Sequence, residues 1–151
     1  MDDSDSIITQ SAAETEAVGK EFGYYVIRPE NINPIRIFLL YGNLGSGKTT
    51  FVRGFAGGLG ISERILSPTY IFIRQYPVPG TGRILYHIDL YRAKSVQEQE
   101  GLGLDDVIAG SGAIILIEWA EYLRIKISEK HTDIRFSVSA GGTHILKIEQ
   151  R

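Results

Sequence analysis

The stretch Gly42–Thr50, GNLGSGKTT, directly follows the apolar run IRIFLLY at residues 35–41. A run that is apolar at nearly every position is typical of a strand covered on both faces of a parallel sheet. After the glycine-rich turn, apolar residues recur four apart at Phe51, Phe55 and Leu59, which predicts a helix. The order of strand, glycine turn and helix is therefore the element on which the fold is expected to be built.

The turn satisfies the Walker A spacing G-x-x-x-x-G-K-[ST] with Gly42, Gly47, Lys48 and Thr49. Glycines permit positive φ angles, so that successive N–H groups converge on an anion, and the following helix directs its positive dipole end at the same charge. Lys48 is suited to neutralise the β- and γ-phosphates of a nucleotide, and the hydroxyl of Thr49 to ligate Mg²⁺. The residues expected to contact the phosphates are Asn43, Leu44, Gly45, Ser46, Gly47, Lys48, Thr49 and Thr50.

The remaining chain alternates helical and strand patterns in a way typical of one α/β domain. We expect a first helix from Ser11 to about residue 25, a loose hairpin of two strands at 70–76 and 83–89, and short helices after Ser95 and around 104–109. We also expect a second buried parallel strand at 113–118 and a hairpin formed by residues 133–139 and 143–149. These elements predict a single three-layer, P-loop NTPase-like domain with a mixed, partly parallel sheet over residues 1–151, in which residues 1–10 form a flexible acidic N-terminus.

Composition limits the possible partners. Sixteen Lys and Arg against eighteen Asp and Glu leave a net charge of -2, so no overall basic field favours direct nucleic-acid binding. The chain has no cysteine, its start is acidic, and its apolar runs are far shorter than the roughly 20 residues that span a bilayer. We therefore expect a cytoplasmic protein without a membrane partner.

Two acids end predicted strands, where nucleotide-binding sheets place metal ligands and water-orienting groups. Glu118 ends the run AIILIE and Asp89 ends RILYHID, although either acid could instead cap a helix or pair with a surface cation. Thr69, in the loop after the helix that follows the glycine-rich turn, is either a switch residue or an ordinary turn hydroxyl. Trp119 could stack on a base, cover the phosphates or fill the core. His87 is expected to be a buried, satisfied histidine.

Four segments, GNLGSGKTT, SPTY, HIDLYR and IEW, stand in an order and at separations that resemble the bacterial TsaE family, formerly called YjeE. The likeness runs from about Thr15 to Glu121 and includes the first helix, TEAVGKEF, and the helix FVRGFAGGLG. Asn43 departs from the aspartate common in the family. His144 stands near the last strand, where the family often has an arginine, which leaves any contact of the C-terminal hairpin with the site open.

The resemblance implies a small ATPase that binds ATP with Mg²⁺ and hydrolyses it slowly alone. It would act with the TsaB and TsaD proteins in the threonylcarbamoylation of adenosine 37 in ANN-decoding tRNAs, resetting the complex and meeting tRNA only through it. Carried over by motif, Lys48 would bind phosphate, Thr49 and Glu118 would hold Mg²⁺, and Asp89 would support the metal and the attacking water. Thr69 would be the switch, and Trp119 would lie beside the site. Arg92 could meet either the γ-phosphate or a partner.

Two alternatives remain at this point. One is a small P-loop kinase that transfers the γ-phosphoryl group to a metabolite, although the chain lacks the arginine-rich lid segment that such kinases usually carry. The other is a nucleotide-binding interaction module without useful turnover, in which Asp89 and Glu118 only hold metal. The favoured reading is the ATPase subunit, with no metabolite acceptor.

Overall fold

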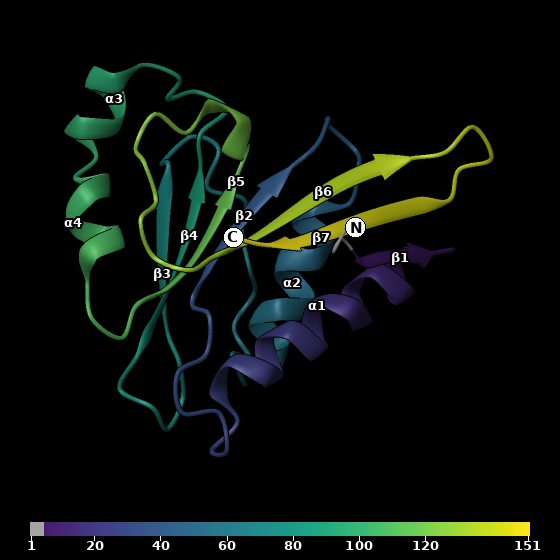
Figure 1. Ribbon diagram of the computed structural model, residues 1–151, viewed down its shortest axis with the longest axis horizontal. Coiled ribbons are helices and arrows are strands. Elements are labelled where there is room, and N and C mark those ends of the chain that lie inside the picture. Colours follow the sequence, from purple (N-terminus) through teal and green to yellow (C-terminus); the bar gives the residue numbers. More distant parts are fainter. Residues whose placement is uncertain (1–4) are drawn as a thin grey trace.

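The computed structural model describes residues 5–151, which form a seven-stranded mixed sheet with the order β1-β7-β6-β2-β5-β4-β3 (Figure 1). Its four central strands, β6, β2, β5 and β4, run parallel, and β1, β7 and β3 join antiparallel. The strands are β1 Asp5–Thr9, β2 Ile37–Tyr41, β3 Ile73–Pro77, β4 Ile84–Asp89, β5 Ile114–Glu118, β6 Thr132–Val138 and β7 His144–Gln150. The predicted mixed sheet with a parallel centre is confirmed.

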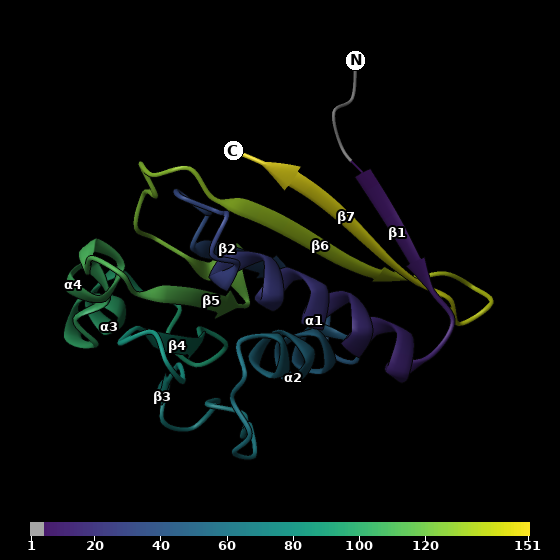
Figure 2. The same ribbon diagram turned by 90° about the horizontal axis from the view of Figure 1, so that it is seen from below.

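Helices cover both faces of this sheet. They are α1 Ala12–Ile27, α2 Lys48–Gly58, α3 Val96–Gly101 and α4 Leu104–Ala109, with a short 3-10 turn at Ala120–Tyr122. Helices α1 and α2 lie side by side on one side of the sheet (Figure 2), where Phe51 and Phe55 of α2 pack against Phe38. On the other face, Leu104 and Ile108 of α4 pack with alternate residues of the same strands. The three-layer architecture is therefore confirmed.

The fully apolar runs occupy the middle of the sheet because both of their faces are covered. In β2, Phe38 belongs to the core beneath α1 and α2, while Leu39 belongs to the core beneath α4. In β5, Leu116 and Ile117 divide in the same way. A strand that buries both faces has no solvent side on which to place polar residues, which explains the absence of alternation in these two runs.

Glycines allow α1 and α2 to approach each other closely. A Cβ at Gly54 would lie 1.9 Å from the backbone oxygen of Glu16, and one at Gly58 would lie 2.1 Å from that of Lys20. Gly23 of α1 faces the backbone of α2 just as tightly. Close backbone packing thus compensates for the helix-weakening glycines of α2 at Gly54 and Gly58, but not at Gly57, where a Cβ would meet no atom within 4 Å.

The flexible N-terminus expected at residues 1–10 is wrong for residues 5–9. These residues form β1, which pairs antiparallel with β7 from Asp5 opposite Ile148 to Thr9 opposite His144. The edge of β7 offers unpaired backbone groups, and the buried hydroxyls of Thr9 and Thr15 lie 2.6 Å apart, which ties the strand to α1. Residues 1–4 lie outside the described part of the chain.

Other predicted boundaries are close to those observed. Helix α2 ends in a glycine turn, in which Gly60 has φ 82° and the N–H of Ile61 donates to the backbone oxygen of Ala56. The strand expected at 70–76 begins only at Ile73, because Phe72 adopts φ 67° and interrupts the extended backbone. Among the described helices, none has the length and apolar character needed to cross a membrane.

The helix contact makes a matched test possible. Gly54→Ala should lower the free energy of unfolding by roughly 1–3 kcal/mol, since its Cβ has no room against α1. Gly57→Ala, in the same helix but facing open space, should raise it by up to about 1 kcal/mol through helix propensity. Urea unfolding followed by circular dichroism measures both; equal losses in the two variants would contradict the close-packing account.

Candidate functional site

A cleft of about 350 Å³ opens at the carboxyl ends of β2, β4 and β5. These three strands are neighbours and run parallel, so their last residues meet at one edge of the sheet. The residues that line the cleft are Ala12, Thr15, Leu44, Gly45, Ser46, Gly47, Lys48, Thr49, Thr50, Ser67, Thr69, Asp89, Glu118, Trp119 and His144. Eleven of the twelve residues predicted from the sequence are therefore brought together in one place.

The loop between β2 and α2 has the backbone that the motif predicts. Gly47 has φ 108° and stands at the N-cap of α2, where no side chain caps the helix. Gly42 has φ 146°, and a Cβ there would lie 2.7 Å from the backbone oxygen of Phe136. An eleven-residue helix whose first N–H groups lack a side-chain cap presents donors and a positive dipole end to an anion. The loop is therefore shaped to bind a negatively charged group.

Lys48 lies at the centre of this loop. Its Nζ donates hydrogen bonds to the backbone oxygens of Gly42 and, at 2.9 Å, Asn43, and it lies 4.2 Å from the centre of the Trp119 ring. Burial lowers the pKa of Lys48, and the nearby charge of Glu118 opposes that shift. This buried ammonium is held by carbonyl dipoles and a π face, and no carboxylate of residues 5–151 forms an ion pair with it, so an anion in the cleft would be attracted to it.

Glu118 is the buried carboxylate at the end of β5. Its Oε1 accepts a hydrogen bond from the hydroxyl of Thr49 at 3.0 Å, and its Oε2 lies 2.5 Å from Nε2 of His87. His87 is fully buried, as expected, but only half satisfied, because its Nδ1 has no hydrogen-bond partner among the described residues. Glu118 is thus fixed on both sides, by the first turn of α2 and by β4.

Asp89 lies directly beside Glu118, because the two residues are register partners of β4 and β5. Its Oδ2 accepts from the hydroxyl of Thr69 at 3.0 Å, and its Oδ1 accepts from the N–H of Tyr91 at 2.9 Å. Burial raises the pKa of Asp89, the hydrogen bond from Tyr91 opposes this shift, and the charge of Glu118 adds to it. The hydroxyl of Thr69 therefore contacts an acid of the site directly, and it also lies 2.8 Å from the hydroxyl of Ser67 in its own loop.

Trp119 lies at the wall of the cleft and is half-buried. It has φ 58°, and its ring contacts the rings of Tyr91 and Tyr122, with centres 5.0 and 5.9 Å apart. A positive φ at a bulky residue is uncommon and is often found at functional sites. Arg92 instead directs its guanidinium over the ring of Tyr70, 4.5 Å from its centre, and does not line the cleft.

Some contributions to the cleft differ from those predicted. Asn43 does not line it, and contributes instead the backbone oxygen that holds Lys48. Thr15 and Ser67 line the cleft without having been singled out as site residues. His144, whose contact the sequence left open, donates from Nδ1 to the backbone oxygen of Ser46 at 2.9 Å, which ties the C-terminal hairpin to the loop.

The oxygen donors at this edge suit a hard cation. Thr49, Glu118 and Asp89 offer a hydroxyl and two carboxylates, which are the ligand types that Mg²⁺ prefers. No group of three or more His, Cys, Asp or Glu residues that could hold a metal alone occurs within residues 5–151. Mg²⁺ at this site would therefore need further oxygens from a phosphate or from water, as is usual for this ion.

Comparisons with known proteins agree on one family. Residues 9–145 match the family model described as "Threonylcarbamoyl adenosine biosynthesis protein TsaE". A tRNA threonylcarbamoyladenosine biosynthesis protein TsaE from Bacillus subtilis is 37% identical over 83% of this chain and 73% of its own length. The one from Rickettsia typhi is 30% identical over 93% and 91%, and the one from Haemophilus influenzae is 37% identical over 68% and 63%, respectively. The crystal structure of Bacillus subtilis YdiB superposes with a TM-score of 0.74 at 29% identity, covering 98% of this chain and 86% of that one.

The pKa shift of Asp89 predicts how its charge affects folding. Because burial raises its folded-state pKa, ionised Asp89 opposes folding, and stability is lost as pH rises through the window that starts at the ordinary value of about 3.9. Asp89→Asn removes the charge, keeps the bond from the N–H of Tyr91 through its oxygen, and can donate from its nitrogen to the hydroxyl of Thr69. It should therefore unfold at higher urea than the parent at about pH 7 in magnesium-free buffer. The difference in stability between the variant and the parent should vanish at about pH 3, where Asp89 is neutral. A variant that is less stable than the parent near neutral pH would contradict this.

Proposed function

This chain belongs to the TsaE family of tRNA threonylcarbamoyladenosine biosynthesis proteins, and we propose that it serves this pathway as an ATPase subunit. It binds Mg-ATP in the cleft at the carboxyl edge of the sheet and hydrolyses the nucleotide slowly. Its partners are the TsaB and TsaD proteins, and it meets tRNA only through them. The observation that carries the proposal is the junction of the Gly42–Thr50 loop with two adjacent buried carboxylates.

The phosphate chain of ATP fits the loop by charge and by geometry. The uncapped start of α2 and the positive-φ glycines direct backbone donors at one point, where Lys48 adds a formal positive charge. Lys48 exchanges its bonds with the oxygens of Gly42 and Asn43 for bonds with phosphate, which are charge-assisted and stronger. This exchange makes the loop responsive to the presence of a nucleotide.

The two acids are suited to different tasks. Thr49 and Glu118, already joined by a hydrogen bond, hold Mg²⁺, and Asp89 supports them from the next strand. When bound, Mg²⁺ supplies positive charge that offsets the charge on the phosphate oxygens. The hydrogen bond between Glu118 and Thr49, the other proposed metal ligand, favours the holding role for Glu118, whereas Asp89, linked to the loop of Thr69, orients the attacking water.

The loop around Thr69 connects the site to the surface. Thr69 bonds to Asp89, and the adjacent Tyr70 and Ile71 are 78% and 50% exposed. Leu44, in the phosphate-binding loop itself, is 90% exposed. Apolar side chains that stand in solvent at the mouth of a site offer a contact surface for another protein. A change at Asp89 on hydrolysis would move these residues, which is how nucleotide state would control the partner complex.

Lys48→Ala should weaken binding of Mg-ATP by roughly tenfold to a hundredfold, since a charge-assisted hydrogen bond contributes about 1.5–3 kcal/mol. Isothermal titration calorimetry of the purified chain measures this. Lys126→Ala, which removes an exposed lysine outside the cleft, is the matched control and should bind like the parent. Unchanged affinity in Lys48→Ala would show that the nucleotide does not bind in this loop.

The role in the pathway requires the whole reaction. With TsaB, TsaD, tRNA and the substrates of the modification, the parent chain should support repeated turnover and Lys48→Ala should not. Modified adenosine in the tRNA, measured by mass spectrometry, reports the outcome. Full modification by Lys48→Ala would remove the ATPase proposal. Phosphate transfer to an added metabolite, with no effect on tRNA, would favour the kinase alternative.

A further inference from the structure

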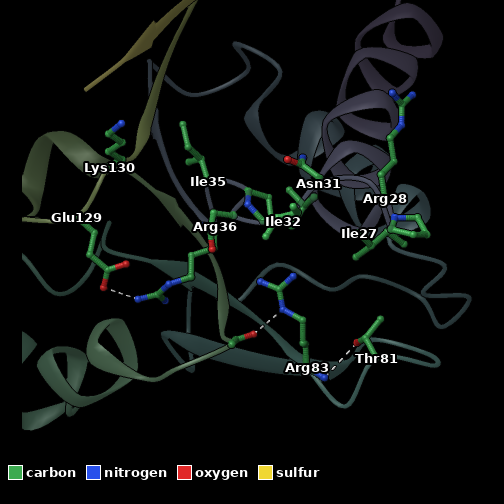
Figure 3. A pocket seen from close by; sticks show the side chains of 15 residues that line it. Ile27, Arg28, Asn31, Ile32, Ile35, Arg36, Thr81, Arg83, Glu129 and Lys130 are labelled. Carbon is green, nitrogen blue, oxygen red and sulfur yellow. Dashed lines mark hydrogen bonds and ion pairs between the residues drawn. The ribbon is translucent and has the colours of Figure 1, made fainter.

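A second cavity, of about 670 Å³, lies at the amino ends of the strands whose carboxyl ends form the cleft. Figure 3 shows the side chains that line it. Its walls come from the segment 26–36 before β2, the turn at 81–83 before β4, Gly112 before β5 and residues 129–130 before β6. We call this cavity the amino-end pocket, because it lies where the central parallel strands begin. A five-residue strand is about 17 Å long, so the two sites are separated by about the length of one strand.

Arginine and lysine side chains dominate the polar wall of the amino-end pocket. Four cationic residues line it, Arg28, Arg36, Arg83 and Lys130, with Glu129 as the one acid among its lining residues. Glu129 is already engaged, since its Oε1 lies 2.5 Å from Arg36. Arg36 also donates to the backbone oxygens of Ile108 at 2.9 Å and Ala113 at 3.2 Å. Arg36 is therefore a structural residue whose charge is neutralised within the protein.

Arg83 has no such acid. Its Nε donates to the backbone oxygen of Gly112 at 2.8 Å, while its two terminal nitrogens make no hydrogen bond and no ion pair within residues 5–151. Burial lowers the pKa of Arg83, and the neighbouring charge of Arg36 lowers it further. Figure 3 shows Arg83 extending from the start of β4 into the pocket, near Arg36. A half-buried guanidinium beside another cation, with its terminal donors unused, favours an anion in front of it.

Isoleucines add apolar surface to the lining of the pocket, beside polar residues of the same segment. Ile27, Ile32 and Ile35 line it, and Ile32 is 88% exposed although it belongs to the wall of a cavity. Cavities of this size that combine apolar lining with a few convergent polar groups are typical of small-molecule sites. A ligand that matched both the cationic and the apolar lining residues would carry an anionic group on an apolar body.

We propose that the amino-end pocket binds a small organic anion. Its carboxylate or phosphate oxygens accept hydrogen bonds from the terminal nitrogens of Arg83, and its apolar body lies against Ile27, Ile32 and Ile35. The planar guanidinium fork matches both anionic groups with two parallel hydrogen bonds. Binding here uses none of the residues of the nucleotide cleft, so the proposal stands independently of the ATPase function.

The test uses phenyl phosphate and phenylacetate as probes and benzyl alcohol as the neutral control, with the full chain labelled for amide NMR. At least one anionic probe should shift the amides of residues 31–36, 81–84 and 112–113 saturably, with a Kd on the order of 1 mM, while benzyl alcohol should not. The probe that binds more tightly identifies the preferred anionic group. Shifts confined to residues 42–50, or none in the amino-end pocket with either anion, would overturn the proposal.

Variants assign the effect to Arg83. Arg83→Gln should weaken binding of the anionic probe about tenfold, and Arg83→Lys, which keeps the charge but loses the fork, should fall between Arg83→Gln and the parent. Arg64→Gln removes an exposed arginine outside both cavities and should bind like the parent. The amide spectrum of each variant without probe shows whether it is folded. If folded Arg83→Gln bound the anionic probe as tightly as the parent, the proposal would be overturned.

Discussion

Three elements of the fold meet at the carboxylate of Glu118. The hydroxyl of Thr49 reaches it from the first turn of α2, Nε2 of His87 reaches it from β4, and β5 carries it to the edge of the sheet. A buried carboxylate needs such partners, because an unpartnered charge in the interior costs several kcal/mol (about 3–5 when one partner of a buried pair is removed). The same contacts fix the phosphate-binding loop beside the acids, so one interaction both stabilises the edge and arranges the proposed chemistry.

The close packing of α1 against α2 also serves the site. Because Gly54 and Gly58 carry no Cβ, α1 lies against the backbone of the helix that begins at Lys48. This places the first turn of α1, with Ala12 and Thr15, at the wall of the cleft. Strand β1, which precedes α1 in the chain, pairs with β7, and His144, the first residue of β7, forms a hydrogen bond with the loop. Segments from both ends of the chain therefore support the loop between β2 and α2.

Local patterns predicted the features that depend on neighbouring residues. The apolar runs predicted β2 and β5, the glycine-lysine spacing predicted the loop, and strand ends predicted Asp89 and Glu118 at one edge. The sequence could not predict contacts made across long separations. Strand β1 forms because β7 offers an edge, His144 meets Ser46 at a separation of 98 residues, and the amino-end pocket joins four segments. No local period or motif encodes such pairings, which tertiary packing alone determines.

The central claim is that the Gly42–Thr50 loop grips the phosphates of a nucleotide next to the two acids. A crystal structure of the chain with a non-hydrolysable ATP analogue and Mg²⁺ tests it most directly. The account predicts that Nζ of Lys48 leaves the oxygens of Gly42 and Asn43 for the phosphates, and that the hydroxyl of Thr49 turns from Glu118 to the metal. An analogue bound elsewhere on the molecule, with these contacts unchanged, would contradict it.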